Sequence, residues 1–377
     1  MPSLGFKVPQ TYIVRSMKYT GKDNFDHAVT PRLGVLVTNL GSPQRADKRA
    51  VRTYLKEFLS DPRVVEIPRL LWWLILNVII LNIRPARSAR AYQRIWTDEG
   101  SPLLVNSRRQ AKALEKLLYE RHGERVVLDH AMRYGQPALP DVVQSMIDRG
   151  VTKLLLLPLY PQYSCATTAS TFDALAQDFT RRRWLPELRF VASYHDHPSY
   201  IRALADSIRA HRAEHGEAQK LVFSYHGEPR SYLDKGDPYH CQCLKTTRLV
   251  ATELGLDETA YLSTFQSRFG KAQWLQPYTD KTLQALAAEG VTSVQVICPG
   301  FSSDCLETLE EIDMENRELF LQAGGERFEY IPCLNDSAAH ITALGDIVEQ
   351  ELATWLAQPE NDSSQTATLA RQLGARN

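Results

Sequence analysis

The chain has 377 residues, in which 44 Lys and Arg side chains balance 44 Asp and Glu side chains. A length of this order accommodates two domains of ordinary size, each with its own hydrophobic core. The zero net charge provides no global field to hold a polyanion, so we expect no nucleic acid as a partner.

The N-terminal residues and the cysteines indicate a cytoplasmic location. Residues 1–30 read as a polar arm in which no continuous apolar core precedes a small-residue cleavage site, so the arm is not a secretory signal. The six cysteines contain no C-x-x-C pair, and they are too sparse for a disulfide framework in a chain of this length. We therefore expect reduced thiols.

Residues 70–83, LLWWLILNVIILNI, form an apolar run that only Asn77 and Asn82 interrupt. A helix needs about 20 apolar residues to cross a bilayer, and Arg84 and Pro85 follow this run at once, so we expect it not to span a membrane. Two interpretations stay open. The run is a buried core helix, or it is an exposed apolar lip that takes up a greasy substrate or touches a membrane surface shallowly.

Further along the chain, short runs rich in Val, Ile and Leu alternate with turns and helical stretches. Such near-continuous apolar runs are typical of parallel strands that helices cover on both faces. Eight of them predict an α/β fold with two doubly wound halves rather than one barrel. The predicted strands are residues 34–43, 126–137, 151–164, 188–198, 220–229, 260–268, 291–303 and 327–336.

An internal likeness supports the two halves. Residues 149–164 and 289–303 both run Gly-Val-Thr, an apolar strand, Pro, an aromatic residue and Ser. Polar residues stand consistently at the carboxyl ends of the predicted strands, where open α/β sheets bind ligands. A cleft between the halves would gather these residues.

The most acidic stretch, DCLETLEEIDME at residues 304–315, places six carboxylates in twelve positions without a Lys or Arg. On a helix, Glu307, Glu311 and Glu315 would share one face, where like charges repel by a few tenths of a kcal/mol per pair. A solvated acidic surface explains such a run without any function. A row of carboxylates also suits a divalent cation, so a path for a metal ion is the alternative.

His226 is a second candidate, because it ends the apolar run KLVFSYH and precedes the turn Gly-Glu-Pro. A hydrogen-bonded structural histidine is the simpler interpretation, and His195 and His197 look like surface turn residues. Together with Glu307, His226 could hold a borderline metal such as ferrous iron or zinc, or pass protons. The sequence lacks the glycine-rich, G-x-S-x-G and H-E-x-x-H motifs of nicotinamide, nucleotide, serine-hydrolase and zincin enzymes.

Eight motifs, in order, give the chain a family resemblance. They are LVTNLGSPQ (36–44), YLKEFLSDPRVVEIP (54–68), YQRIWTDEGSPL (92–103), MRYGQP (132–137), PLYPQYSCATTAS (158–170), FSYHGEPRSYLDKGDPY (223–239), TFQSRFGKAQWLQPYT (264–279) and PGFSSDCLETLEEID (299–313). From residue 34 to near residue 350 the sequence resembles ferrochelatases of the proteobacterial type. The resemblance implies two Rossmann-like domains around a porphyrin cleft, and insertion of ferrous iron into protoporphyrin IX with release of two protons. This reaction is the terminal step of haem synthesis and needs no organic cofactor.

The resemblance also implies the roles of individual residues. His226 and Glu307 match the pair assigned to iron, and the division between iron ligand and proton acceptor stays open. Asp304, Glu311 and Glu315 match a path for protons or metal. The residues that match porphyrin contacts are Leu40, Arg84, Arg87, Tyr92, Ser101, Arg133, Tyr134, Pro229 and Trp274. Ordinary surface charge for the arginines and core packing for the aromatic residues are the simpler alternatives.

The implied domains are residues 31–175 with 337–357, which include the lip at 70–83, and residues 176–336, which carry His226 and Glu307. Residues 358–377 are polar, and we expect them to be disordered. The lip matches the family's active-site lip, which takes up a membrane-soluble substrate. It therefore implies a cytoplasmic protein with peripheral contact to the inner membrane.

One departure from the family concerns cysteine. Many ferrochelatases carry a [2Fe–2S] cluster on cysteines that include a C-terminal group, and this chain has no cysteine after Cys333. Cys165 matches one cluster ligand, but one thiolate cannot replace four. We expect no cluster, although Cys241 and Cys243 leave a nonstandard metal site open.

Two other functions remain to be weighed. A close variant uses coproporphyrin III, which has four propionates, but the apolar lip favours the less charged porphyrin. A tetrapyrrole or haem carrier without catalysis would need the pocket and an iron ligand, but no proton relay.

Overall fold

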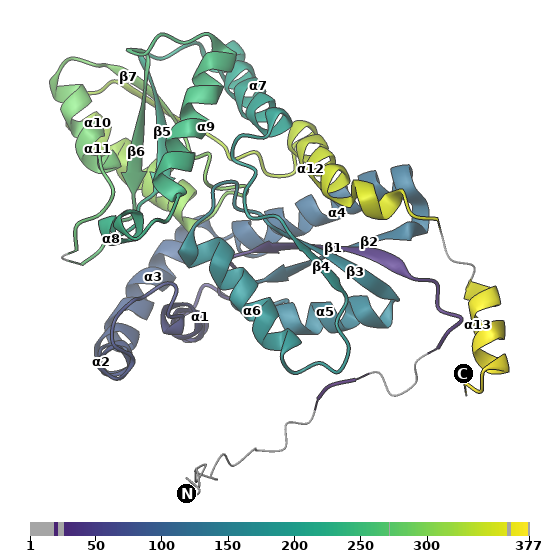
Figure 1. The fold of residues 1–377 in the computed structure, drawn as a ribbon. Coiled ribbons are helices and arrows are strands. Elements are labelled where there is room, and N and C mark those ends of the chain that lie inside the picture. Colours follow the sequence, from purple (N-terminus) through teal and green to yellow (C-terminus); the bar gives the residue numbers. More distant parts are fainter. Residues whose placement is uncertain (1–18, 22–25, 271, 360–362, 376–377) are drawn as a thin grey trace, which may run out of the picture.

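The computed structural model describes residues 19–21, 26–270, 272–359 and 363–375, and parts of the predicted arm and tail lie outside them. Two parallel four-stranded sheets form the centre of the molecule, and helices flank each sheet (Figure 1). The first sheet consists of β1 (Arg32–Asn39), β2 (Val126–Met132), β3 (Val151–Pro158) and β4 (Glu187–Phe190). The second consists of β5 (Lys220–His226), β6 (Tyr261–Gln266), β7 (Ser293–Ile297) and β8 (Arg327–Ile331).

The two sheets have the same topology. Their strand orders are β2-β1-β3-β4 and β6-β5-β7-β8, with every pairing parallel. The two segments with the internal likeness contain β3 and β7, which occupy equivalent positions. The predicted α/β fold with two doubly wound halves is confirmed, and each of the eight predicted strands overlaps an observed one.

Helices cover both faces of both sheets. The helices of the first half are α1 (Lys48–Ser60), α2 (Arg69–Leu74), α3 (Leu81–Ile95), α4 (Pro102–His122), α5 (Leu139–Asp148) and α6 (Ser170–Phe179). In the second half they are α7 (Pro198–His215), α8 (Arg230–Asp234), α9 (Tyr239–Leu254), α10 (Thr279–Ala288) and α11 (Arg317–Gln322). Short 3₁₀ and π-helical segments are Gly123–Arg125, Ile75–Ile80, Cys165–Ala169 and Glu307–Asn316, and the last is called the acidic helix below.

The alternation of side chains along the strands divides the core. Val35 and Val37 of β1 belong to the same buried cluster as Phe223 and Tyr225 of β5, so one core runs through both halves. Leu36, which points to the other face of β1, packs in a separate cluster with side chains of α5. The helix α12 (Ala338–Leu356) contacts both α4 and α7 and closes the molecule across the two halves.

Two boundaries differ from the expected ones. The boundary after residue 175 would place β4 in the second domain, but β4 pairs with β3 in the first sheet. The sequence of β4, which has only 4 residues, could not show which sheet this strand would join. Part of the tail that was expected to be disordered forms a helix, α13 (Ser363–Gln372). This helix buries Ala367, and the hydroxyl oxygen of Ser363 lies 3.1 Å from that of Thr30. Ala, Leu, Gln and Arg are good helix formers, which outweighs the polar composition here.

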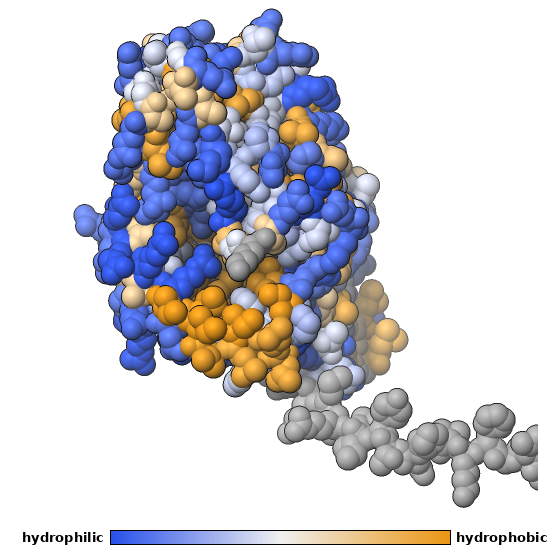
Figure 2. All heavy atoms as spheres, turned by 90° about the vertical axis from the view of Figure 1, so that its left-hand side faces the viewer, coloured by the Kyte–Doolittle hydropathy of each residue, from blue (hydrophilic) through white to orange (hydrophobic). Residues whose placement is uncertain are grey.

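The lip at residues 70–83 is mostly exposed rather than buried. It lies within a helical run, Arg69–Ile95, that is long and apolar enough to cross a membrane by length and composition alone. Trp72, Leu76 and Leu81 anchor this run in a buried cluster with α1. Figure 2 shows the resulting apolar patch on one face of the molecule. Its large exposed side chains are Leu70, Leu71, Trp73, Leu74, Val78, Ile79 and Ile83.

Candidate active site

His226 is the last residue of β5, at the carboxyl edge of the second sheet. Its Nδ1 lies 2.7 Å from the carbonyl oxygen of Gly227, which can only accept a hydrogen bond. Nδ1 therefore carries the proton in the neutral ring, and Nε2 keeps its lone pair. Residue 227 must be glycine because a Cβ there would lie 2.6 Å from the Gln266 carbonyl oxygen and 3.3 Å from the Trp274 ring.

Gln266 links this edge to the acidic helix. It is the last residue of β6 and pairs with His226 in the sheet. Its Nε2 donates to the Glu307 carbonyl oxygen at 2.9 Å and lies 3.4 Å from the Glu311 carboxylate. The structure thus brings the predicted histidine and the predicted acids to one place, through a residue that the sequence did not single out.

Glu311 is held by Ser267. The Ser267 backbone N–H donates to its carboxylate at 2.7 Å, and the Ser267 hydroxyl donates to the second oxygen. To do so, Ser267 adopts a φ of 63°, in the left-handed region that is uncommon for residues other than glycine. Burial raises the pKa of Glu311 to about 7, although the Ser267 bonds oppose this shift.

Glu307 faces the first half of the molecule. Burial raises the pKa of Tyr92 on α3, and the nearby Glu307 carboxylate raises it further. Desolvation lowers the pKa of Arg84, and the same carboxylate partly offsets that effect. Glu307, Arg84 and Tyr92 therefore lie close enough to act on one another across the two halves.

The other predicted acids have different surroundings. Asp304 is buried and accepts hydrogen bonds from the Tyr330 hydroxyl at 2.6 Å and from the Asn335 amide at 2.7 Å, so it anchors the start of the acidic helix. Glu315 is exposed at the far end of that helix. Of the four predicted acids, all within the described residues, Glu307 and Glu311 bond to the edge that carries His226, Glu307 through its backbone carbonyl and Glu311 through its carboxylate.

Aromatic and cationic side chains surround this edge. Arg84 lies over the Phe269 ring, with 5.6 Å to its centroid, and the rings of Phe269 and Trp274 are 4.8 Å apart. Trp274 also forms an isolated bridge with Pro229. Contacts thus link three predicted porphyrin contacts, Arg84, Pro229 and Trp274, beside Gly227, which follows His226. Phe269 is an addition that the sequence did not suggest.

The other residues that were predicted to contact the porphyrin lie in the first half of the molecule. Tyr92 and Tyr134 belong to the buried cluster that anchors the lip, and Leu40 packs against it. Side chains from the acidic helix and the residue before it, Leu306, Leu309 and Met314, pack on the same cluster. Arg87 is exposed on α3, and Ser101 is buried at the start of α4.

Arg133 and Tyr134 are tied into a buried network. The guanidinium of Arg133 and the hydroxyl of Tyr134 both donate to the carboxylate of Asp61, the latter at 2.8 Å. Ser170 donates to the same carboxylate at 2.6 Å. These bonds hold Arg133 and Tyr134 in place, and neither Asp61 nor Ser170 was singled out from the sequence.

The described residues contain no group of three or more His, Cys, Asp or Glu side chains arranged to hold a metal ion. His226 and Glu307 can offer one nitrogen and one carboxylate from neighbouring elements. A pair of this kind suits the delivery of a metal to a ligand that provides the other donors, because ferrous iron accepts both imidazole and carboxylate.

Comparison with known proteins identifies the family. The ferrochelatase family model matches residues 32–352. The ferrochelatase of Idiomarina loihiensis is 59% identical over 349 residues, which cover 93% of this chain and 96% of that protein. The ferrochelatase of Marinobacter nauticus is 57% identical over 359 residues, which cover 94% and 97%. The chain belongs to the ferrochelatase family.

A solved structure agrees on the fold. SirB from Bacillus subtilis, whose structure was determined with Fe³⁺, has a TM-score of 0.51 to this chain and 11% sequence identity, and the match covers 87% of this chain and 99% of SirB. At that identity the likeness concerns the fold alone. It agrees with the predicted α/β fold of two Rossmann-like halves.

Three of the residues that the sequence missed lie at one strand end. Gln266 ends the observed strand β6, and Ser267 and Phe269 follow it, all inside the motif TFQSRF. Their position at a carboxyl strand end was the available signal. The partners of Gln266 and Ser267 on the acidic helix lie far away in the sequence, so the spacing of residues could not reveal them.

Glu311 makes the stability of this ferrochelatase depend on pH. Its pKa of about 7 in the folded protein exceeds its ordinary value of 4.5, so its stabilising contribution is complete below pH 4.5 and is lost as pH rises through 7. The loss amounts to about 3 kcal/mol at most. Glu311→Gln should remove this dependence, and its melting temperature relative to the wild type should rise between pH 5 and pH 8.

Thermal unfolding across that range checks the prediction. Glu315→Gln, which removes an exposed acid from the same helix, is the matched control. A Glu311→Gln difference that does not change with pH, or changes no more than the control, would contradict it.

Proposed function

We propose that the protein inserts ferrous iron into protoporphyrin IX and releases two protons, the last step of haem synthesis. The observation that supports this most is the meeting of His226 with Glu307 and Glu311 through Gln266, opposite Arg84 and Tyr92. Membership of the ferrochelatase family supports the same reaction.

The substrate defines the chemistry that these residues must perform. A flat porphyrin holds its nitrogen lone pairs in the ring plane and carries two inner N–H protons. The two protons leave as Fe²⁺ enters, so the charge of the ring core is unchanged. The catalyst must bend the ring, accept the protons and present iron from one face, and these tasks need a base and a metal ligand on the same side.

His226 and the two glutamates can share these tasks. Nε2 of His226 has a free lone pair and is a suitable first proton acceptor. Glu307 then holds iron or passes the proton on. Glu311, with a pKa of about 7, can take up and release a proton at neutral pH, and Glu315 lies exposed further along the same helix.

The surroundings fit a large apolar disc with two carboxylates. The Trp274 and Phe269 rings and the lip provide apolar contact area, and Arg84 and Arg87 offer guanidinium groups for the propionates. Leu40, Tyr92 and Pro229 complete the wall. The apolar lip favours protoporphyrin IX over a porphyrin with four carboxylates.

Removal of either central side chain should abolish most of the activity. His226→Ala and Glu307→Gln should each reduce the rate of iron insertion by about 10² or more, because each removes a group that acts in the transition state. Porphyrin binding should stay within severalfold of the wild type. An anaerobic assay that follows the loss of porphyrin fluorescence with ferrous iron measures the rate, and fluorescence titration measures binding. Unchanged rates in both variants would favour a carrier.

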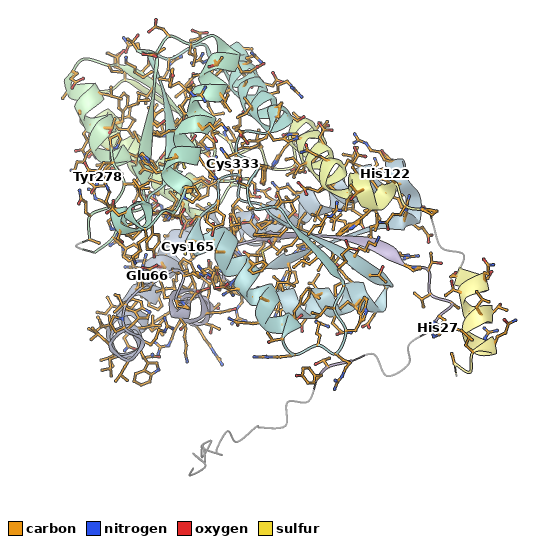
Figure 3. The ribbon with its side chains drawn as sticks, viewed as in Figure 1. His27, Glu66, His122, Cys165, Tyr278 and Cys333 are labelled. Carbon is orange, nitrogen blue, oxygen red and sulfur yellow. The ribbon has the colours of Figure 1, made fainter. Side chains whose placement is uncertain are left out.

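We also propose that the enzyme works without an organic cofactor and without a [2Fe–2S] cluster. Cys165 and Glu66 both line a cavity of about 480 Å³. Figure 3 shows these two residues side by side, with Cys333 elsewhere in the molecule. Cys241 is exposed and Cys243 is buried on α9. Protein purified anaerobically should therefore show no cluster absorbance between about 300 and 500 nm, because one thiolate cannot replace four. Such a band with cysteine-bound iron would contradict the proposal.

We further propose that the protein is cytoplasmic and that its lip rests on the surface of the inner membrane. Trp73 and Val78 are 59% and 63% exposed on the lip. Their replacement in Trp73→Ser/Val78→Ser should lower the affinity for phosphatidylcholine vesicles by about tenfold or more, because each loses apolar contact with lipid. Vesicle co-sedimentation measures this, and Tyr119→Ser, at a 58% exposed site on α4, is the control. Equal vesicle binding by all three proteins would contradict the proposal.

A further inference from the structure

Gln110 is a buried amide that joins the two halves. It lies on α4 in the first half and is 1% exposed. Its Nε2 donates to the carbonyl oxygens of Ser302 at 2.7 Å and Asn335 at 3.0 Å, and its Oε1 accepts from the Ser303 hydroxyl at 2.9 Å. All three partners belong to loops of the second half. The side chain thus uses both its donor protons and its acceptor across the junction.

The loop that Gln110 holds leads directly into the acidic helix. Asp304 follows Ser303, and it forms a two-point contact with Asn335: its N–H donates to Asn335 Oδ1 at 2.9 Å, and the Asn335 amide donates to its carboxylate at 2.7 Å. Asp304 also accepts from the hydroxyl of Thr308, at 3.2 Å, inside the acidic helix. A displacement of residues 302–304 would therefore carry the first turn of that helix, and Glu307 with it.

The bonds of Gln110 are not needed to satisfy the backbone. The Ser302 carbonyl also accepts from the Asn335 N–H at 3.1 Å, and the Asn335 carbonyl also accepts from the buried His340 ring at 2.7 Å. Both carbonyls would keep a partner if the amide were lost. The particular contribution of Gln110 is to fix these loops against the first half, which carries Arg84 and Tyr92.

We propose that Gln110 is a positioning residue for iron insertion, and that it sets where the Glu307 carboxylate stands relative to His226 and to the ring bound against the first half. This inference rests on the proposed function. Gln110 touches neither of these side chains in the structure and acts through the loop at 302–304. A misplacement of a reacting group by about 1 Å can cost up to about 10² in rate, so the effect should be large.

Gln110→Met tests the inference, because methionine keeps the length and shape of the side chain and removes its hydrogen bonds. The turnover number should fall by about 10-fold to 100-fold, and the KM for protoporphyrin should change less than about twofold. In the double variant Gln110→Met/Glu307→Gln, the loss should be clearly smaller than the product of the two single losses, because both act through one carboxylate.

Two further variants separate this role from general stability. Gln295→Met removes another fully buried glutamine, which bonds to the Gly216 carbonyl and to Glu329 within the second half. It should lower the melting temperature by a similar amount and leave turnover unchanged. Ser303→Ala removes only one bond to Gln110 and should lower turnover by about twofold to fivefold. It decides the matter if Gln110→Met does not fold.

The outcomes distinguish the inference from the proposed function. If Glu307→Gln slows insertion while Gln110→Met and Ser303→Ala do not, the positioning role is wrong and the proposed function stands. Multiplicative losses in the double variant, or an equal loss of turnover in Gln295→Met, would also overturn the positioning role. If Glu307→Gln itself has no effect, the proposed function fails first.

Discussion

The amide of Gln266 holds the histidine edge of the second sheet against the acidic helix, and the proposed chemistry depends on this contact. Its Oε1 accepts a hydrogen bond from the Ser224 hydroxyl at 2.8 Å, so its Nε2 must face the helix, where it bonds to the Glu307 carbonyl. Because Gln266 also pairs with His226, the sheet itself fixes the imidazole relative to the acids. Two groups from distant parts of the sequence thus share one rigid frame.

The same region explains how six carboxylates fit into twelve residues. Four of them have partners of their own: Asp304 bonds to Tyr330 and Asn335, Glu310 to Arg94, Glu311 to Ser267, and Asp313 to Arg317. Burial also makes Glu311 partly neutral near pH 7, which weakens its repulsion of Glu307. The charge run is therefore neither a plain solvated surface nor an open row of free ligands. Most of its acids are structural, and two of them face the first half: Glu310, which bonds to Arg94 on α3, and Glu307, which lies near Arg84 and Tyr92.

The sequence indicated the eight strands but not that β4 joins the first sheet, and it indicated the acids but not the residues that surround them. Apolar runs indicate strands because burial on both faces leaves a local mark, and His226 and Glu307 stand at strand ends or in a marked acidic run. Gln266 carries no such mark, because a glutamine at a strand end is ordinary until its partner is known. The same reason applies to Asp61, whose carboxylate collects Arg133, Tyr134 and Ser170 from separate elements.

The acidic helix, residues 307–316, has a π-helical form because residues from other parts of the chain hold it in place. Its hydrogen bonds run from residue i to i+5 and widen each turn, a form that is rare because it packs less well along its own axis. Here separate anchors hold it: Asp304 before its start, Gln266 at Glu307, Ser267 at Glu311, and the Asn316 amide on the Glu311 carbonyl at 2.8 Å. An α-helical pattern in the sequence correctly groups the acids, but the loops that hold the helix decide where each carboxylate stands. Uncharged residues such as Gln266 and Ser267 therefore determine the geometry of the site.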